Sequence, residues 1–145
     1  MKDTSSSFLG TGWAFPPAFN KDLQTVEMVS NDEDIWESIK IIIGTIPGER
    51  YMFPRFGCGI RKFVFESNDP TQITMLRDTI YLSLLYNEPR IKVESIEIKD
   101  SMSESQDDNG RLDGTIYIHI SYTIIITNSR SNLVFPFYFD EGTNI

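Results

Sequence analysis

From Thr115 to Thr127 the sequence alternates between large apolar side chains and smaller or polar ones. Side chains of a β-strand point to opposite faces in turn, so every second residue lies on one face. The face defined in this way consists of Ile116, Ile118, Ile120, Tyr122, Ile124 and Ile126. A strand with such a face is stable only in a sheet that other elements cover. The segment therefore predicts a covered sheet.

Two further segments are expected to be strands of the same sheet. Residues 90–99 change phase between Val93 and Ile96, which predicts a bulge near Glu94-Ser95. Residues 132–139 follow a hairpin connection at 128–132 and contain Pro136, which has no N–H to donate, so this strand is expected at an edge. Its apolar face is Leu133, Phe135, Phe137 and Phe139.

A first helix is predicted between Ser30 and Pro47-Gly48. Ser30 and Glu33 have the spacing of a capping box, and the Pro-Gly pair is a stop signal. Isoleucines then recur at helical spacing and define one face, which is Ile35, Ile39, Ile42, Ile43 and Ile46.

A second helix is predicted from Asp69 to Pro89. Asp69 is the expected cap, Pro70 takes the first helical position and Gln72 closes the box. The expected buried stripe is Ile73, Leu76, Ile80 and Leu84. With the three strands, the two helices predict a small single α+β domain in which two helices pack on a mainly antiparallel sheet.

A chain of 145 residues is most simply one domain. Residues 1–24 are interpreted as an N-terminal arm that lies on the domain. The domain itself is expected at 25–139, with a brief strand at 25–29, a short strand or extended segment at 61–66 and a mobile Ser/Asp/Gly-rich loop at 100–113. Residues 140–145 form a tail.

Charge and composition narrow the possible partners. The net charge is −8 and the pI is near 4.6, which argues against nucleic acid as a partner. No apolar run reaches membrane-spanning length, and the first residues lack the apolar centre of a signal peptide, so we expect no membrane partner and a cytoplasmic protein. A single cysteine excludes an internal disulfide framework.

No residue set predicts catalysis, a cofactor or a metal. Cys58 and His119 are the only Cys and His, and they are interpreted as a small turn residue and a strand-face histidine. They cannot supply a zinc site. The segment from Ser105 faintly matches a calcium loop, but Ile116 stands where a bidentate Glu is needed.

The segment Glu88-Pro89-Arg90 marks the corner between the second helix and the first strand of the sheet. Proline favours an extended Glu88, so Glu88 and Arg90 are expected to lie side by side. Two interpretations stay open. The pair closes the corner within the chain, or it offers a carboxylate and a guanidinium to a partner. As an exposed pair it would add only about 0–1 kcal/mol to stability, and its loss would leave the fold intact.

The chain resembles the GPW-type baseplate wedge family of contractile injection machines. That family includes the sheath-initiator protein of T-even phage baseplates and the TssE component of type VI secretion. The resemblance rests on Leu9-Gly10-Thr11-Gly12-Trp13, Pro16-Pro17, Thr45, Pro47-Gly48-Glu49-Arg50, Pro54, Phe56-Gly57, Phe65-Glu66 and Glu88-Pro89-Arg90-Ile91.

The resemblance implies a structural protein without enzymatic activity. It implies that the chain docks on the core bundle of wedge proteins, offers its sheet to sheath subunits to initiate sheath assembly, and is present in several copies in a ring. The implied partner-binding residues are Glu88, Pro89, Arg90, Glu49 and Arg50. The alternative is a lysozyme-like tail enzyme that cleaves peptidoglycan.

Overall fold

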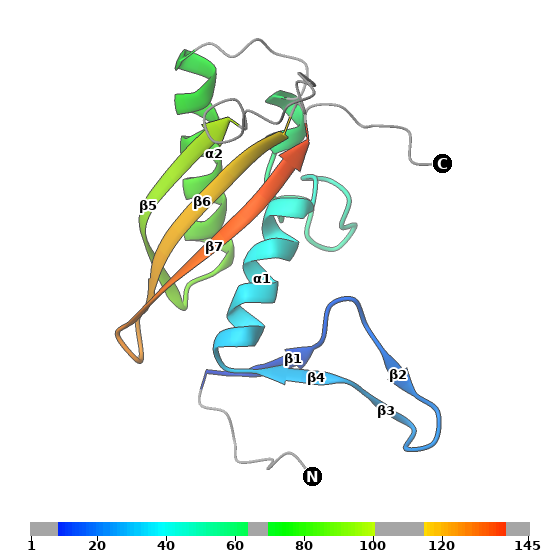
Figure 1. The fold of residues 1–145 in the computed structure, drawn as a ribbon. Coiled ribbons are helices and arrows are strands. Elements are labelled where there is room, and N and C mark those ends of the chain that lie inside the picture. The colour runs from blue at the N-terminus through cyan, green and yellow to red at the C-terminus, as the bar shows by residue number, and fades with distance from the viewer. Residues whose placement is uncertain (1–8, 64–69, 101–114, 139–145) are drawn as a thin grey trace, which may run out of the picture.

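A three-stranded antiparallel sheet forms the centre of the fold. In the computed structural model, which describes residues 9–63, 70–100 and 115–138, the strands are β5 (Ile91–Asp100), β6 (Thr115–Ile124) and β7 (Ser129–Tyr138), in the order β5-β6-β7. The helices α1 (Asp32–Gly44) and α2 (Pro70–Asn87) cover one face of this sheet (Figure 1). The predicted α+β class is confirmed.

The predicted face of the central strand forms the core of this arrangement. Its residues from Ile116 to Ile124 are buried on the helix side, whereas Ile126 lies beyond the end of β6 and is 61% exposed. The residues that meet them from the helices are Ile35, Ile39, Ile42, Ile43, Leu76, Ile80 and Leu84. All belong to one hydrophobic cluster, so the sheet and helices share a single core.

Two further expectations about the sheet are confirmed. The register of β5 against β6 shifts between Val93 and Ser95, which is the predicted bulge. The strand that contains Pro136 lies at an edge, since among the described residues β7 pairs only with β6. The opposite edge is β5.

The capping box predicted for the first helix is wrong. Ser30 is the last residue of β4 (Met28–Ser30) and pairs with Thr11, so its backbone is held in a ladder. The N-cap is Asn31, with φ of 60° and no side-chain cap hydrogen bond. Three acidic residues still follow in the first turn, where they suit the helix dipole. The helix ends at Gly44, before the predicted Pro-Gly stop.

The second helix begins at Pro70 as predicted, while its expected cap Asp69 lies outside the described residues. The buried stripe is shorter than predicted, because Ile73 is 37% exposed. Figure 1 shows the first turn of α2 reaching past the end of β5.

The strand or extended segment expected at 61–66 is also wrong for the residues that are described. Residues Ile60–Phe63 form a 3-10 turn, η1, in which the Lys62 amide donates to the Gly59 carbonyl oxygen. Ile60 is buried in the core, so packing of its side chain favours the turn. Residues 64–66 lie outside the described part.

The N-terminal arm forms a ribbon whose base contacts the domain, since Leu9 belongs to the core and the Phe15 amide donates to Glu37 Oε2 at 2.9 Å. Strand β1 (Thr11–Trp13) pairs with β4, and β2 (Phe19–Asn20) pairs with β3 (Thr25–Val26). Figure 1 shows the ribbon projecting from the start of α1. The brief strand expected at 25–29 is therefore divided between β3 and β4. Residues 1–8, the loop at 101–114, and Phe139 with the tail at 140–145 lie outside the described residues.

Candidate docking site

The corner at Glu88-Pro89-Arg90 is closed by a two-pronged ion pair. The α2 helix ends at Asn87, and the Glu88 amide still donates to the Leu84 carbonyl oxygen at 2.9 Å. Arg90 Nε donates to Glu88 Oε1 at 2.7 Å, and Arg90 Nη2 donates to Glu88 Oε2 at 2.8 Å. This is the planar, bidentate geometry that gives the strongest Arg–carboxylate pairs.

The same guanidinium also binds two distant parts of the chain. Arg90 Nη1 donates to Asp34 Oδ2 at 2.6 Å and to the Leu9 carbonyl oxygen at 3.0 Å. Asp34 lies in the first turn of α1, and Leu9 precedes the ribbon. One side chain therefore joins the corner, the start of α1 and the base of the ribbon.

Glycines let the ribbon backbone approach this network. A Cβ on Gly12 would collide with the Asp34 carboxylate, and a Cβ on Gly10 would lie 3.4 Å from Arg90 Nη1. Gly10 also has a φ of +105°, a conformation that other residues rarely adopt. The Gly-Thr-Gly segment is thus explained by close contact with the ion pair.

Burial corrects the expectation that the pair is exposed. The side chain of Glu88 is 3% exposed and that of Arg90 is 26% exposed. The structure therefore confirms that Glu88 and Arg90 form an ion pair that closes the corner within the chain. Pro89 is exposed at the surface of the corner. Whether Glu88, Pro89 and Arg90 also bind a partner stays a prediction.

Glu88 and Arg90 each favour the charged form of the other. Burial alone would raise the pKa of Glu88, but hydrogen bonds from Arg90 and Ser38 outweigh it and hold that pKa below its usual value. The hydrogen bond to Glu88 raises the pKa of Arg90, and Asp34 adds to this effect. The carboxylate is an ionised acceptor and is unsuited to act as a proton donor near neutral pH.

Glu49 and Arg50 do not join this corner. They lie in the loop after α1, at the opposite end of that helix from Asp34. Glu49 Oε2 accepts a hydrogen bond from the Ile46 amide at 3.1 Å, and the Arg50 guanidinium lies 4.0 Å from the centre of the Phe56 ring. The five predicted partner-binding residues thus lie at opposite ends of α1, in two separate parts of the structure.

Cys58 and His119 occupy the positions that the sequence predicts. Cys58 lies in the turn before η1 and is 1% exposed, and burial raises its pKa to about 11. His119 lies mid-strand in β6 between Glu97 and Val134, on the face away from the helices. Cys58 belongs to the core that the helices and the sheet share, whereas His119 is on the other face of β6, so the two do not form a nucleophile–base pair.

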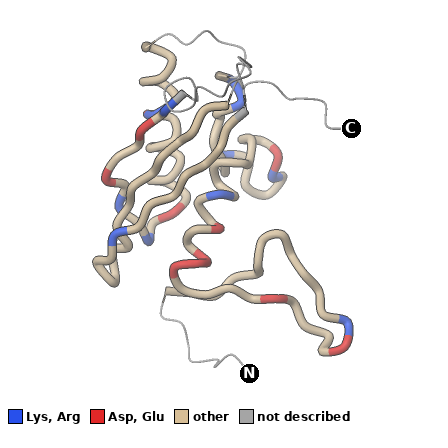
Figure 2. The backbone as a smooth tube through the Cα atoms, in the orientation of Figure 1, with Lys and Arg blue, Asp and Glu red and all other residues tan. Residues whose placement is uncertain are grey.

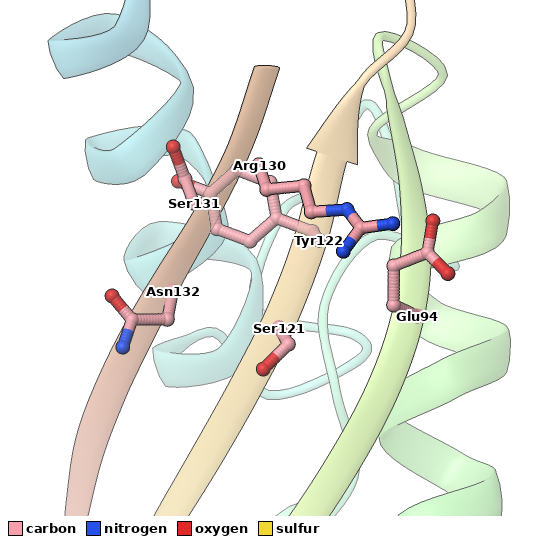
Figure 3. Close-up of a pocket in the computed structure, with 6 residues that line it drawn as sticks. All are labelled: Glu94, Ser121, Tyr122, Arg130, Ser131 and Asn132. Carbon is pink, nitrogen blue, oxygen red and sulfur yellow. The ribbon is translucent and has the colours of Figure 1, made fainter. Parts of the chain in front are cut away.

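A shallow hollow lies where β5, β6 and β7 meet the final hairpin (Figure 3). Arg130 reaches across β6 toward Glu94 in this view. Glu94 Oε1 accepts a hydrogen bond from Thr123 Oγ1 at 3.1 Å. Glu94 is the one carboxylate that lines the hollow, whereas glycoside hydrolysis requires two that face each other.

The described residues also bear on metal binding and membrane insertion. No group of three or more His, Cys, Asp or Glu side chains is placed to hold a metal ion there. Within the same residues, neither helix combines the length and apolar character of a membrane span.

Sequence reasoning did not identify Asp34 or the Leu9 carbonyl as partners of Arg90. Asp34 could be interpreted only as a first-turn acidic residue that suits the helix dipole. A carbonyl oxygen gives no sequence signal at all. The glycines at 10 and 12 were the available sign of a close backbone approach.

Known proteins share both the sequence pattern and the fold. The sequence profile of a family described as baseplate wedge protein gp25 matches residues 29–129. A candidate tail lysozyme from Geobacter sulfurreducens is 38% identical, with a TM-score of 0.67 over 79% of this chain and 96% of that chain. No curated protein matches the chain.

Two baseplate structures share the fold at lower identity. A chain of the six-fold symmetrised anti-feeding prophage baseplate is 23% identical, with a TM-score of 0.63 over 93% of this chain and 90% of that chain. A chain of the post-contraction pyocin R2 baseplate is 18% identical, with a TM-score of 0.53 over 74% of this chain and 97% of that chain.

Proposed function

The chain belongs to the family of baseplate wedge protein gp25, and from this premise we propose how it works as a structural baseplate component of a contractile injection machine. It docks on the core bundle of wedge proteins at one end and starts sheath assembly at the other. It acts in several copies within a ring, assembled in the cytoplasm into a phage-tail-like or type VI-like particle. Its domain is residues 25–139.

The Glu88-Pro89-Arg90 corner is the proposed wedge-docking surface. Its shape is set before binding, because Arg90 holds Glu88, Asp34 and the Leu9 carbonyl at once. A rigid surface loses little conformational entropy on binding. The partner would meet the exposed Pro89 and the accessible part of Arg90, while Glu88 acts from beneath as the residue that positions the guanidinium.

A variant at Pro89 tests this surface without breaking the ion pair. Pro89→Asp is expected to leave the melting temperature nearly unchanged and to reduce co-purification with wedge subunits by at least about tenfold, as expected when a charge is left unpaired in an interface. Lys92→Asp, at a neighbouring residue that is 72% exposed, is the control. Equal recovery of wedge subunits with both variants would contradict the proposal.

The observation behind sheath initiation is a small sheet with two unpaired edges in the described part of the chain. Only β6 has strand partners on both sides. An exposed edge can bind an extended segment of another protein by strand addition, in which backbone hydrogen bonds supply affinity. Pro136 removes a donor from β7, which favours β5 as the edge that meets the sheath.

Proline scanning distinguishes the two edges. Single prolines are placed along residues 95–99 of β5 and along β7, and alanine at each position is the matched control for side-chain loss. Folded variants with proline at an outward amide of β5 are expected to lose recruitment of sheath subunits. Unchanged recruitment for every folded proline variant on both edges would rule out strand addition.

We propose that the chain has no enzymatic activity, although the similarity to the Geobacter protein makes peptidoglycan cleavage a second candidate. Two carboxylates do approach each other, at Glu88 and Asp34, but both bind the Arg90 guanidinium. A general acid needs a raised pKa, and the pKa of Glu88 is lowered. Purified cell wall incubated with the protein should release no reducing ends. Release that is lost in Asp34→Asn or Glu94→Gln would establish the enzyme instead.

A further inference from the structure

The loop between α1 and η1 presents three large apolar side chains to solvent. Tyr51 is 95% exposed, Met52 is 81% exposed and Phe53 is 68% exposed. Single exposed apolar residues are common, but a contiguous cluster marks an interaction surface. Tyrosine and arginine, which flank each other here, are also the residue types most enriched where binding energy is concentrated.

Backbone hydrogen bonds hold this loop in a defined shape. The Phe53 amide donates to the Arg50 carbonyl at 3.2 Å, and the Phe56 amide donates to the Phe53 carbonyl at 3.0 Å. At the base, the Cys58 amide donates to the Thr45 carbonyl at 2.8 Å, which ties the loop to the end of α1. The exposed tip is therefore pre-organised, as a binding surface should be.

The loop is also basic in an acidic chain. Arg50 and Arg55 lie in the loop and Arg61 and Lys62 follow in η1, whereas Glu49 is the one acidic residue in 45–62. That one, Glu49, already accepts the Ile46 amide. Arg55 is exposed and has no hydrogen bond or ion pair with any other described residue. Figure 2 shows blue beside red in this loop, whereas the first turn of α1 is red.

We propose that the loop tip, defined as Arg50, Tyr51, Met52, Phe53 and Arg55, binds an acidic segment of another baseplate protein, in which carboxylates surround a large apolar side chain. Complementary charge selects this partner, because Arg50 and Arg55 flank the apolar tip. Nucleic acid and anionic membranes are disfavoured by the net charge of −8.

This surface is separate from the corner at Arg90. The corner contacts α1 in its first turn through Asp34, whereas the loop begins after the last turn, and the 13 residues of α1 span about 20 Å. The inference rests on the proposed place of the chain in a baseplate, but it adds a second contact and the chemistry of its partner.

A photo-crosslinking residue at position 51 tests the proposal in whole particles. The gene is replaced in the producing cells by variants with the crosslinker, and the captured peptide is sequenced from assembled baseplates. We expect a peptide from another baseplate protein that contains Asp or Glu beside large apolar residues. Adding Arg55→Glu should reduce the crosslink about tenfold, and Lys92→Glu should not, since Lys92 lies outside the tip.

The possible results distinguish the loop proposal from the proposed role of the chain in a baseplate. Particles that contain the chain but give a basic or uncharged peptide, or no crosslink at position 51, overturn the loop proposal and leave the baseplate role intact. Binding of the purified protein to phosphatidylglycerol vesicles that Arg55→Glu abolishes would establish a membrane surface as the partner instead. A chain that is absent from purified particles even when unmodified would contradict the proposed function itself.

Discussion

Arg90 connects three parts of the protein that are far apart in sequence. Its guanidinium binds groups 2, 56 and 81 residues away in sequence, which are Glu88, Asp34 and the Leu9 carbonyl. Buried ion pairs of this kind add little compared with apolar packing, but removing one member leaves a buried charge without a partner. The network is therefore better understood as a device that fixes geometry than as a source of net stability.

Arg90→Ala should lower the free energy of unfolding by about 3 kcal/mol, because the buried carboxylate of Glu88 then lacks its partner. Denaturant unfolding followed by circular dichroism measures this. Arg130→Ala, at an exposed arginine of β7, is the matched control and should change stability by less than about 0.5 kcal/mol. A cost for Arg90→Ala as small as that of the control would show that the corner is not structurally required.

The lowered pKa of Glu88 predicts a dependence of stability on pH. Above the ordinary glutamate pKa, near 4.3, the carboxylate is ionised in both states and its contribution is complete. As the pH falls further, the unfolded chain takes up the proton first, so this contribution is lost on approach to the lower folded pKa.

Unfolding at pH 7 and at several values below 5 should therefore show a steeper loss for the native protein than for Glu88→Gln, which cannot titrate. Subtracting the two curves removes the effect of other carboxylates. Parallel curves would mean that the pKa of Glu88 is the same in the folded and unfolded states.

At the scale of elements, the connection after α1 tolerates a side chain least at Gly57, compared with Gly44 and Gly48. Gly57 has a φ of +116°, and a Cβ there would collide with the Thr45 carbonyl oxygen. Gly48 has a φ of +98° but open space around it, and Gly44 ends α1 with open space as well. A side chain would thus cause backbone strain and a steric collision at Gly57, backbone strain alone at Gly48 and neither at Gly44.

Alanine substitutions at these glycines should rank accordingly. Gly48→Ala should cost about 1–2 kcal/mol from its left-handed backbone alone. Gly57→Ala should cost more than that, because the Thr45 carbonyl must also move. Gly44→Ala should be neutral or should stabilise by up to about 1 kcal/mol, since alanine favours the helix. Chemical unfolding of the three variants tests the order, and a Gly57→Ala cost no larger than that of Gly48→Ala would contradict it.

At the scale of the whole molecule, stability should be unevenly distributed. The sheet and both helices share one core, whereas β2 and β3 pair through only Phe19–Val26 and Asn20–Thr25. A two-stranded ribbon without a core is marginal by itself.

Amide hydrogen exchange should reveal this difference. The amides of β6 should open only with global unfolding, while those of residues 19–26 should be protected by about 3 kcal/mol less. Protection of the ribbon equal to that of β6 would show that it unfolds with the core.

The sequence by itself determined the two α-helices and the three strands of the central sheet, because their signals are local. Alternation in 115–127, the phase change near Glu94, Pro70 at the start of α2 and Pro136 in β7 each concern neighbouring residues. The structure agrees with these signals, except that β6 ends at Ile124 and not at Thr127. The sequence also predicted the Glu88–Arg90 pair at the corner, since both residues are adjacent to Pro89.

Only the tertiary structure decided what depends on distant residues. Pairing with Thr11 made Ser30 a strand residue in place of a helix cap. Folding brought Asp34 and Leu9 to Arg90 and so buried a pair that sequence spacing left open to solvent. The length of α1 kept Glu49 and Arg50 away from that corner, although the two motifs look alike in sequence. A local pattern specifies backbone conformation, whereas burial and separation are set by how the elements pack together.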